Sequence, residues 1–297
     1  MSYLELTARE RIACVFDAGS FVEFLPPSAR VISPHLGELN TPVAFDDGVV
    51  VGRALLGGEK VFAAAQEGGF MGGAVGEVHG AKLVGLLRRA VAERVGAVVL
   101  LLESGGVRLH EANAGLIAVS EVMRAVLDAR AAGIAVVTLA GGANGVFGGM
   151  GIVARCTNVV VMSEEGRLAM SGPEVIETAS GVEEFDSQDR ALVWRTSGGK
   201  HRYLLGDCQA IVADSTAQFR QAAIDAIAAC GAGPTDVSLQ DLELEQAMLG
   251  ERIARFGAMT DPLEIWAALG VEQPDAIPML DAAQFAAVAG PHRLGGH

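Results

Sequence analysis

Residues 97–151 decide the fold, and they read AVVLLLESGGVRLHEANAGLIAVSEVMRAVLDARAAGIAVVTLAGGANGVFGGMG. Two runs in this stretch, 98–102 and 134–139, are apolar at successive positions, which is typical of parallel strands covered on both faces. Apolar residues spaced three and four apart predict a helix over 111–132 between them. Because such a crossover is right-handed, the glycine turns that follow both strands should lie at one edge of the sheet. Ligands of such sheets bind at that edge.

Composition limits the class of protein. The chain has 297 residues, of which 51% are hydrophobic, so it can build one large core with a smaller appendage. The net charge of -14 argues against nucleic acid or an anionic membrane surface as a partner. No signal-peptide pattern is visible, and no apolar run reaches the ~20 residues of a membrane helix. The four cysteines show no C-x-x-C spacing, so we expect a cytoplasmic protein with reduced thiols.

The flanking sequence predicts further elements around this centre. Strands are expected at 49–51 and 61–65, joined by a hairpin turn at Gly57-Gly58, and at 159–162 and 168–173. Helices are expected over 4–18, 79–95, 148–154, 174–176, 216–230 and 242–256. Residues 177–202 are polar and indicate a surface excursion, and the sequence GAGP at 231–234 indicates a linker. The expected domains are therefore 1–233 and a helical extension over 234–297.

The two glycine turns are the candidate catalytic elements. An exposed amide at such a turn is a fixed dipole, and one amide from each turn can hold a thioester oxygen that becomes negative during reaction. Each donor of this kind lowers a barrier by ~2.7–4 kcal/mol. The helix after Gly106 would add its positive end. One glycine turn alone would be a common structural feature, but two on successive strands favour a site. The expected catalytic positions are Gly105, Gly106, Val107, Asn144, Gly145 and Val146.

Other catalytic chemistry has little support in the sequence. No G-x-S-x-G elbow surrounds Ser104. His110 and Glu111 follow the first turn and are candidates for an acid or a base, as is His79 at a helix start. A lone histidine is more often a surface residue or one with its hydrogen bonds made inside the fold. No H-E-x-x-H, phosphate-loop or dinucleotide motif occurs, so no metal site is expected.

Four ordered segments between Val49 and Asp214 resemble the acyl-CoA carboxyltransferases. They are FMGGAVG at 70–76, SGGVRLHE at 104–111, Gly145-Val146, and GPEVIE at 172–177. The resemblance implies an α/β, crotonase-like (ClpP/crotonase) spiral of ββα units, with a site at the interface with a second, related chain. Substrate-binding positions are expected in the first two segments, at Gly72, Gly73, Ser104 and Arg108. For a phosphate or carboxylate of the substrate, the further candidates are Lys200, His201 and Arg202, which are equally interpretable as solvated charges.

Differences from the general carboxyltransferase pattern show which group of that family this chain resembles most. The acetyl-CoA carboxylase β subunit usually carries a zinc ribbon of C-x-x-C pairs, which this chain lacks, and AGGANGVFGGMG at 140–151 is most similar to the β subunit of biotin-independent malonate decarboxylase. In that family the β and γ subunits together convert a malonyl thioester on an acyl carrier protein to the acetyl thioester. The resemblance therefore implies a hetero-oligomer with a γ-type carboxyltransferase subunit and an acyl carrier protein. It also implies that the carrier's CoA-like prosthetic group presents the substrate, with no cofactor bound directly to this chain.

Two other functions fit the same residues. A biotin-dependent acyl-CoA carboxyltransferase β subunit would use nearly identical oxyanion chemistry, so the glycine turns do not separate it from a decarboxylase. A non-catalytic scaffold would only position a partner subunit and would need none of the turn amides. Substitution of Gly106 or Gly145 distinguishes a scaffold from a catalytic chain.

Overall fold

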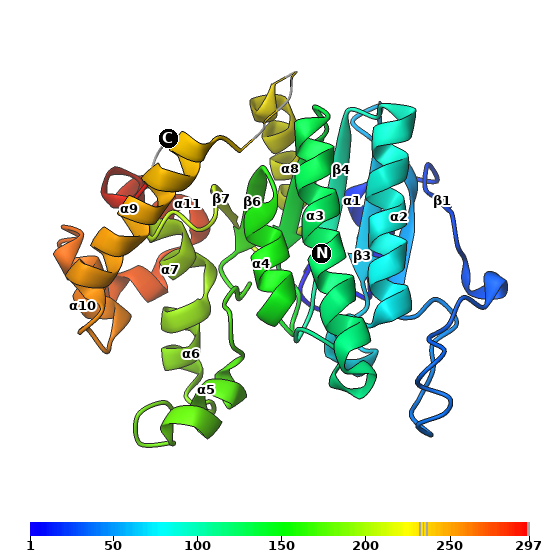
Figure 1. The fold of residues 1–297 in the computed structure, drawn as a ribbon. Coiled ribbons are helices and arrows are strands. Elements are labelled where there is room, and N and C mark those ends of the chain that lie inside the picture. Colours follow the sequence, from blue (N-terminus) through cyan, green and yellow to red (C-terminus); the bar gives the residue numbers. More distant parts are fainter. Residues whose placement is uncertain (232, 234, 236, 296–297) are drawn as a thin grey trace.

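A seven-stranded sheet forms the centre of the molecule (Figure 1). The computed structural model describes residues 1–231, 233, 235 and 237–295. The strands lie in the sheet in chain order; β1, β2 and β3 are antiparallel, and β3 to β7 run parallel. The predicted parallel core and the hairpin at Gly57-Gly58 are thereby confirmed. The strands are β1 (Val22–Glu23), β2 (Val49–Leu56), β3 (Glu59–Gln66), β4 (Ala97–Leu102), β5 (Ala135–Ala140), β6 (Val159–Ser163) and β7 (Ala210–Val212).

Helices cover both faces of this sheet, as its continuously apolar strands predict (Figure 1). The even-numbered residues of β4 pack in one core cluster, and the odd-numbered residues pack in another on the opposite face. The first cluster lies under α2 (Glu77–Glu93), α3 (Asn113–Ala131) and α4 (Gly148–Cys156). The second lies under α1 (Ala8–Val15) and α8 (Thr216–Cys230).

The ends of several elements differ from the sequence predictions. Helix α1 is shorter than 4–18 because Thr7 and Glu10 form a capping box that fixes its start. Helix α3 begins at Asn113 because a 3-10 turn precedes it. No strand forms over 168–173, where single bridges replace a ladder. The 3-10 turns are η1 (Pro27–Ala29), η2 (Met71–Gly73), η3 (Leu109–Glu111), η4 (Pro274–Met279) and η5 (Gly290–His292).

Helices beyond β6 enclose a third apolar cluster. The polar stretch 177–202 is folded into helices rather than forming only a surface excursion, and Lys200 and His201 within it are buried. The prediction is confirmed for residues 178–192, most of which are exposed, and is wrong for 193–202. Charge alone does not show which side chains a later helix will cover. The cluster consists of Leu204, Trp266, Val271, Ile277, Phe285 and Ala289. The helices are α5 (Pro173–Ser180), α6 (Arg190–Ser197), α7 (Gly199–Leu204), α9 (Leu239–Phe256), α10 (Pro262–Ala268) and α11 (Ala282–Ala289).

The C-terminal extension packs beside the β7 end of the sheet (Figure 1). It shares the third apolar cluster with α7, so it is anchored on the first predicted domain rather than separate from it. Of the linker expected at 231–234, residues 232 and 234 lie outside the described residues. The boundary between 1–233 and 234–297 stays a prediction.

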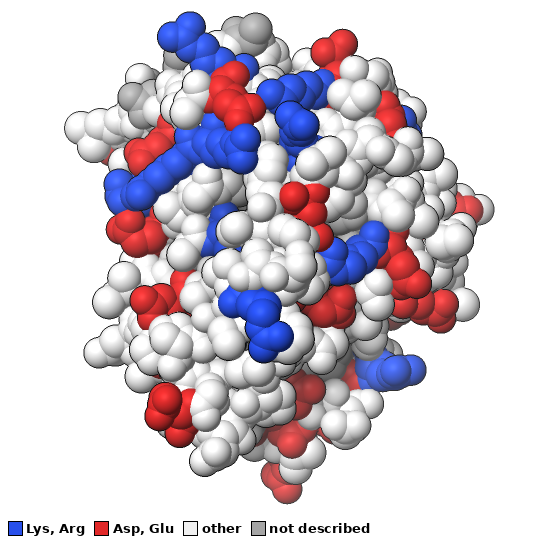
Figure 2. Space-filling view, turned by 90° about the vertical axis from the view of Figure 1, so that its right-hand side faces the viewer, with Lys and Arg blue, Asp and Glu red and all other residues white. Residues whose placement is uncertain are grey.

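The surface carries charges of both signs. Figure 2 shows basic and acidic side chains interspersed over the face it displays. Exposed ion pairs such as Lys60 with Glu93, at 2.8 Å, contribute little to stability. Within the described residues, no helix combines the length and apolarity needed to cross a membrane.

Candidate active site

Loops from neighbouring strands meet at the carboxyl edge of the parallel sheet. Isolated parallel bridges pair Val75 with Val107, Ser104 with Val146, and Val146 with Leu168. These bridges join the loops after β3, β4, β5 and β6 in the order of the strands that they follow. The prediction that both glycine turns lie together at one edge is confirmed.

Two glycines from these turns, Gly106 and Gly148, face each other. Their φ angles are +121° and +59°, in the region that L side chains rarely adopt. A Cβ built on Gly148 would lie 3.1 Å from Gly106 Cα and 4.0 Å from Val107 N. Glycine at both positions therefore keeps the two backbones close and leaves the space beside Val107 free of side chains.

Two backbone amides flank this pair of glycines. No carbonyl or side chain among the described residues accepts a hydrogen bond from the half-buried Val107 amide. On the other side, Gly149 lies in the first turn of α4, where the N-cap residue Phe147 supplies no side-chain hydrogen bond. The amides of Val107 and Gly149, with the positive end of α4, can therefore stabilise one oxyanion.

The structure corrects the other predicted catalytic amides, which serve the fold. An N–H group that already donates within a turn is not free to hold a substrate oxygen. Gly105 donates to Gly72 O (2.8 Å), Gly106 to Ser104 Oγ (3.1 Å), Asn144 to Glu103 Oε1 (2.9 Å), Gly145 to Gly142 O (3.0 Å) and Val146 to Arg167 O (2.8 Å). The expected helix dipole is also corrected, because the helix that begins beside Gly106 is α4 and not α3.

The expected substrate-binding positions fall into two groups. Gly72 is half-buried beside Gly105, and Gly73 is buried where a Cβ would overlap the Glu103 carbonyl. Ser104 and Arg108 are enclosed, with 0% and 1% of their surfaces exposed. These two expectations are corrected: both side chains bind within the fold and do not reach the surface where a substrate would lie.

Arg108 is the centre of a buried ion cluster. Its Nη1 donates to both carboxylate oxygens of Asp47 at 3.1 Å and to Glu111 at 2.6 Å. Burial raises the pKa of Asp47, and the charge of Arg108 opposes that rise. Nη2 of Arg108 also donates to the Ala74 carbonyl at 3.2 Å. Arg108 thus fixes the turn after β4 against the loop after β3 instead of binding a phosphate.

Glu103 connects the second glycine turn to the rest of the site. One of its carboxylate oxygens accepts the Asn144 N–H, and the other pairs with Arg11 of α1. The Asn144 side chain in turn donates to Gly68 O at 2.9 Å. Helix α1 and two glycine-rich loops are therefore held in one arrangement by a buried carboxylate.

The basic residues at 200–202 are also paired inside the protein. Lys200 Nζ lies 2.8 Å from Glu164 and donates to the Pro278 carbonyl. His201 Nδ1 accepts the Trp266 indole N–H at 3.1 Å. Arg202 pairs with an aspartate, Asp207, at 3.1 Å. They are neither free substrate ligands nor solvated charges, so both interpretations of the sequence were wrong.

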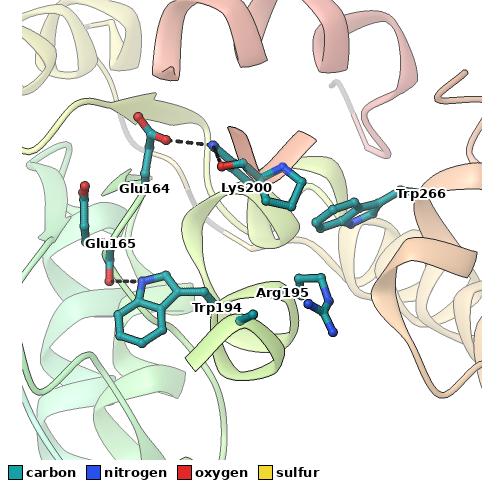
Figure 3. Close-up of a pocket in the computed structure, with 8 residues that line it drawn as sticks. Glu164, Glu165, Trp194, Arg195, Lys200 and Trp266 are labelled. Atoms are coloured by element: carbon teal, nitrogen blue, oxygen red, sulfur yellow. Dashed lines mark hydrogen bonds and ion pairs between the residues drawn. The ribbon is translucent and has the colours of Figure 1, made fainter. Parts of the chain in front are cut away.

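A cavity of about 240 Å3 lies between the loop after β6, α6 and the C-terminal extension (Figure 3). Both tryptophans of the chain, Trp194 and Trp266, line it. The Trp194 indole N–H donates to Glu165 O at 3.1 Å, and Lys200 is paired with Glu164 (Figure 3). Because its indole and ammonium donors are already used, the carboxyl edge with its free amides is the stronger candidate for the reaction.

Two buried histidines make acid stability a testable property. Burial lowers the pKa of His79 and of His201 to about 3. Histidine in an unfolded chain titrates near pH 6.5, so below that pH the unfolded state binds protons that the folded state does not. The contribution of these two histidines to the free energy of unfolding is complete above pH 6.5. It is lost as the pH falls toward 3, by about 1.4 kcal/mol per pH unit for each histidine.

Urea unfolding between pH 7 and 5.5 measures this slope. His201→Asn keeps an oxygen that can accept the Trp266 N–H and should reduce the slope by about one histidine's share. The same slope in the variant and the wild type would contradict the assignment of His201 as a neutral buried group.

No metal site is evident in the part of the chain that the structure describes. Within it, no group of three or more His, Cys, Asp or Glu side chains is placed to hold an ion. The four cysteines are free thiols. The expected absence of a metal and of a directly bound cofactor stays a prediction.

Sequence reasoning missed one of the two amides that the structure brings together. The signal for Gly149 was present, because the pair Gly148-Gly149 opens a helix directly after the second turn. The sequence predicted that short helix but did not indicate that its first residue, Gly148, lies against Gly106 of the first turn. No pattern marked Arg167, whose position depends on the loop after β6.

Comparison with known proteins agrees with this geometry. The profile of the carboxyl transferase domain matches residues 5–213. The chain is 39% identical to the malonyl-S-ACP:biotin-protein carboxyltransferase MADC of Malonomonas rubra, over 97% of this chain and 95% of that protein. It is 30% identical to the acetyl-coenzyme A carboxylase carboxyl transferase subunit beta of Fusobacterium nucleatum, over 59% of each chain.

Solved structures extend the comparison. A chain of a Pseudomonas malonate decarboxylase hetero-tetramer in complex with malonate matches with a TM-score of 0.78 and 40% identity, over 84% of this chain and 91% of that one. A transcarboxylase 12S structure matches with a TM-score of 0.63 at 24% identity, over 74% of this chain and 40% of that one, and so supports the fold alone. The expected crotonase-like α/β fold and the sequence resemblance are confirmed. The chain belongs to the carboxyl transferase family and, within it, to the malonate decarboxylase group.

Proposed function

We propose that this chain is the catalytic β-type subunit of a malonate decarboxylase. It converts a malonyl thioester on an acyl carrier protein to the acetyl thioester and CO2, jointly with a γ-type subunit. The observation that carries this proposal is the close approach of Gly106 and Gly148, flanked by the amides of Val107 and Gly149. The relatives named for malonyl-S-ACP carboxyl transfer and malonate decarboxylation support the substrate class.

The chemistry needs a place for negative charge. When the bond between the carboxylate carbon and the α-carbon breaks, CO2 leaves and its bonding electrons form an enolate with charge on the thioester oxygen. Amides of Val107 and Gly149 aimed at that oxygen stabilise the enolate and the transition state that leads to it. A proton then adds to the α-carbon and gives the acetyl thioester.

Partner chains contribute to the proposed reaction. The Pseudomonas malonate decarboxylase structures are a hetero-tetramer and an MdcD–MdcE hetero-dimer, which supports a hetero-oligomer with a γ-type carboxyltransferase subunit here. The name of the Malonomonas relative supports an acyl carrier protein as the partner that carries the substrate. The carrier's CoA-like prosthetic group would then reach the carboxyl edge of the sheet. A cytoplasmic location stays a prediction.

A biotin-dependent carboxyltransferase is the second candidate, favoured by one observation. The Malonomonas relative, at 39% identity, is named for transfer to a biotin protein. Avidin separates the two functions, because it sequesters biotin and leaves other steps intact. We expect CO2 release by the assembled complex to be the same with and without avidin. Inhibition by avidin would contradict the biotin-independent function and favour the carboxyltransferase.

A further inference from the structure

Arg167 lies in the loop after β6, above the second glycine turn. Its carbonyl accepts the Val146 N–H at 2.8 Å, and its Cβ lies 3.0 Å from a Cβ built on Gly145. Its Nη2 donates to the Ala143 carbonyl. The guanidinium is thereby held at the rim of the candidate active site, on the side away from the turn after β4.

The charge of Arg167 has no acidic partner at short range. Among the described residues, no carboxylate lies within 4.0 Å of its guanidinium nitrogens, and Glu174 and Glu103 act on it only from farther away. Its Nε is buried without a hydrogen-bond partner, and burial lowers the pKa of the guanidinium. Arg167 is half-buried, and a partly desolvated cation without a carboxylate partner gains free energy when an anion binds to it.

Two aromatic rings orient this guanidinium. Arg167 Cζ lies 5.0 Å from the centre of the Trp194 ring and 5.6 Å from that of Phe147. Trp194 is itself fixed by its hydrogen bond to the Glu165 carbonyl (Figure 3). Cation–π contacts offset part of the lost hydration and leave in-plane N–H groups unused. A planar fork of donors fits two oxygens of a carboxylate or phosphate.

We propose that Arg167 binds anionic oxygens of the thioester substrate, from either a phosphate of the carrier arm or the malonyl carboxylate. This inference rests on the proposed function. The loop advances three residues from Arg167 to Met170, whose carbonyl accepts the Gly148 N–H at 3.0 Å. At about 3.3 Å per extended residue, the Arg167 backbone lies at most about 10 Å from that contact. It lies against Gly145, on the side of the second turn away from the facing glycines. The malonyl carboxylate is only two bonds from the thioester carbon, so a phosphate farther along the arm is the expected source.

Binding of two probes to the full chain tests the proposal and its source. CoA carries phosphates without a malonyl group, whereas malonyl-N-acetylcysteamine carries the carboxylate without a phosphate. We expect Arg167→Met to weaken CoA binding by about tenfold to 100-fold in calorimetric titration and to leave the affinity for malonyl-N-acetylcysteamine unchanged. Arg167→Lys should restore part of the affinity for CoA, because it keeps the charge but loses the planar fork.

Arg190→Met is the matched control. Arg190 is exposed and lies 5.9 Å from the same Trp194 ring, so this variant removes one charge beside that ring and leaves Arg167 in place. It should bind CoA like the wild type, and all variants should keep the wild-type urea midpoint. Weaker binding of malonyl-N-acetylcysteamine alone would assign Arg167 to the carboxylate.

Two results would overturn the proposal. The first is equal affinity of the wild type and Arg167→Met for both probes, and the second is no binding of either probe by the wild type. Because the titration needs no turnover, its failure is distinct from failure of the proposed function. A chain that binds CoA through Arg167 but supports no CO2 release with its partner would contradict only the proposed function.

Discussion

Gly106→Ala should lower the rate of CO2 release from a malonyl thioester by about 10²–10³-fold, the loss typical of removing one oxyanion donor. Alanine is strained at the φ of +121° found there, so the turn shifts the neighbouring Val107 amide. A Cβ would also lie 3.6 Å from Gly148 Cα, in the gap between the two facing glycines. Steady-state kinetics of the assembled complex should show the loss mainly in kcat, because the amide acts on charge that develops during reaction.

Gly105→Ala is the matched control for this substitution. Gly105 is the neighbouring glycine of the same turn, but its φ lies outside the left-handed region. A Cβ there would meet nothing closer than Gly72 O at 3.5 Å, an ordinary contact. We expect activity within about twofold of the wild type. If Gly106→Ala kept full activity in an assembled complex, the reaction site would lie elsewhere and the scaffold function would be favoured.

Arg108→Met should have the largest effect on stability. It leaves the carboxylates of Asp47 and Glu111 without the guanidinium that holds them, in a site where all three side chains have 0% exposure. Loss of one partner from a buried ion cluster costs about 3–5 kcal/mol. Since a folded domain is stable by only about 5–15 kcal/mol, urea unfolding should show a large shift of the midpoint.

A surface arginine and a combined variant serve as controls for Arg108. Arg124 pairs with Glu121 on the exposed side of α3, and Arg124→Met should leave the urea midpoint unchanged. Adding Asp47→Asn and Glu111→Gln to Arg108→Met removes the uncompensated charges and should recover part of the stability. If Arg108→Met had the stability of the wild type, the cluster would not anchor the turn after β4.

The sequence was most informative where one physical rule applied to many residues. Continuous apolar runs marked β4 and β5 as buried parallel strands, and right-handed crossovers then placed both glycine turns at one edge. Apolar residues spaced three and four apart predicted the helices, among them α2, α3 and α8. The ordered motifs resemble those of the acyl-CoA carboxyltransferases, and this resemblance predicted the crotonase-like fold and the family.

The sequence was least informative where tertiary contacts decide the direction of a backbone N–H group or the burial of a charged side chain. Glycine turns showed where amides gather, but the direction of each N–H depends on its partner, such as Glu103 for Asn144. Lys200 and Arg108 looked like ligands because their burial depends on segments far away in the chain. The unpaired state of Arg167 likewise depends on the packing of Trp194 from α6, which no local pattern indicates.

The central claim is that this chain supplies one part of a shared decarboxylase site. The most direct test measures CO2 release from a malonyl thioester without biotin, first with this chain alone and then with its γ-type partner. We expect release only with the partner. No release under either condition, with carboxyl transfer once a biotin carrier is added, would contradict it and identify a carboxyltransferase instead.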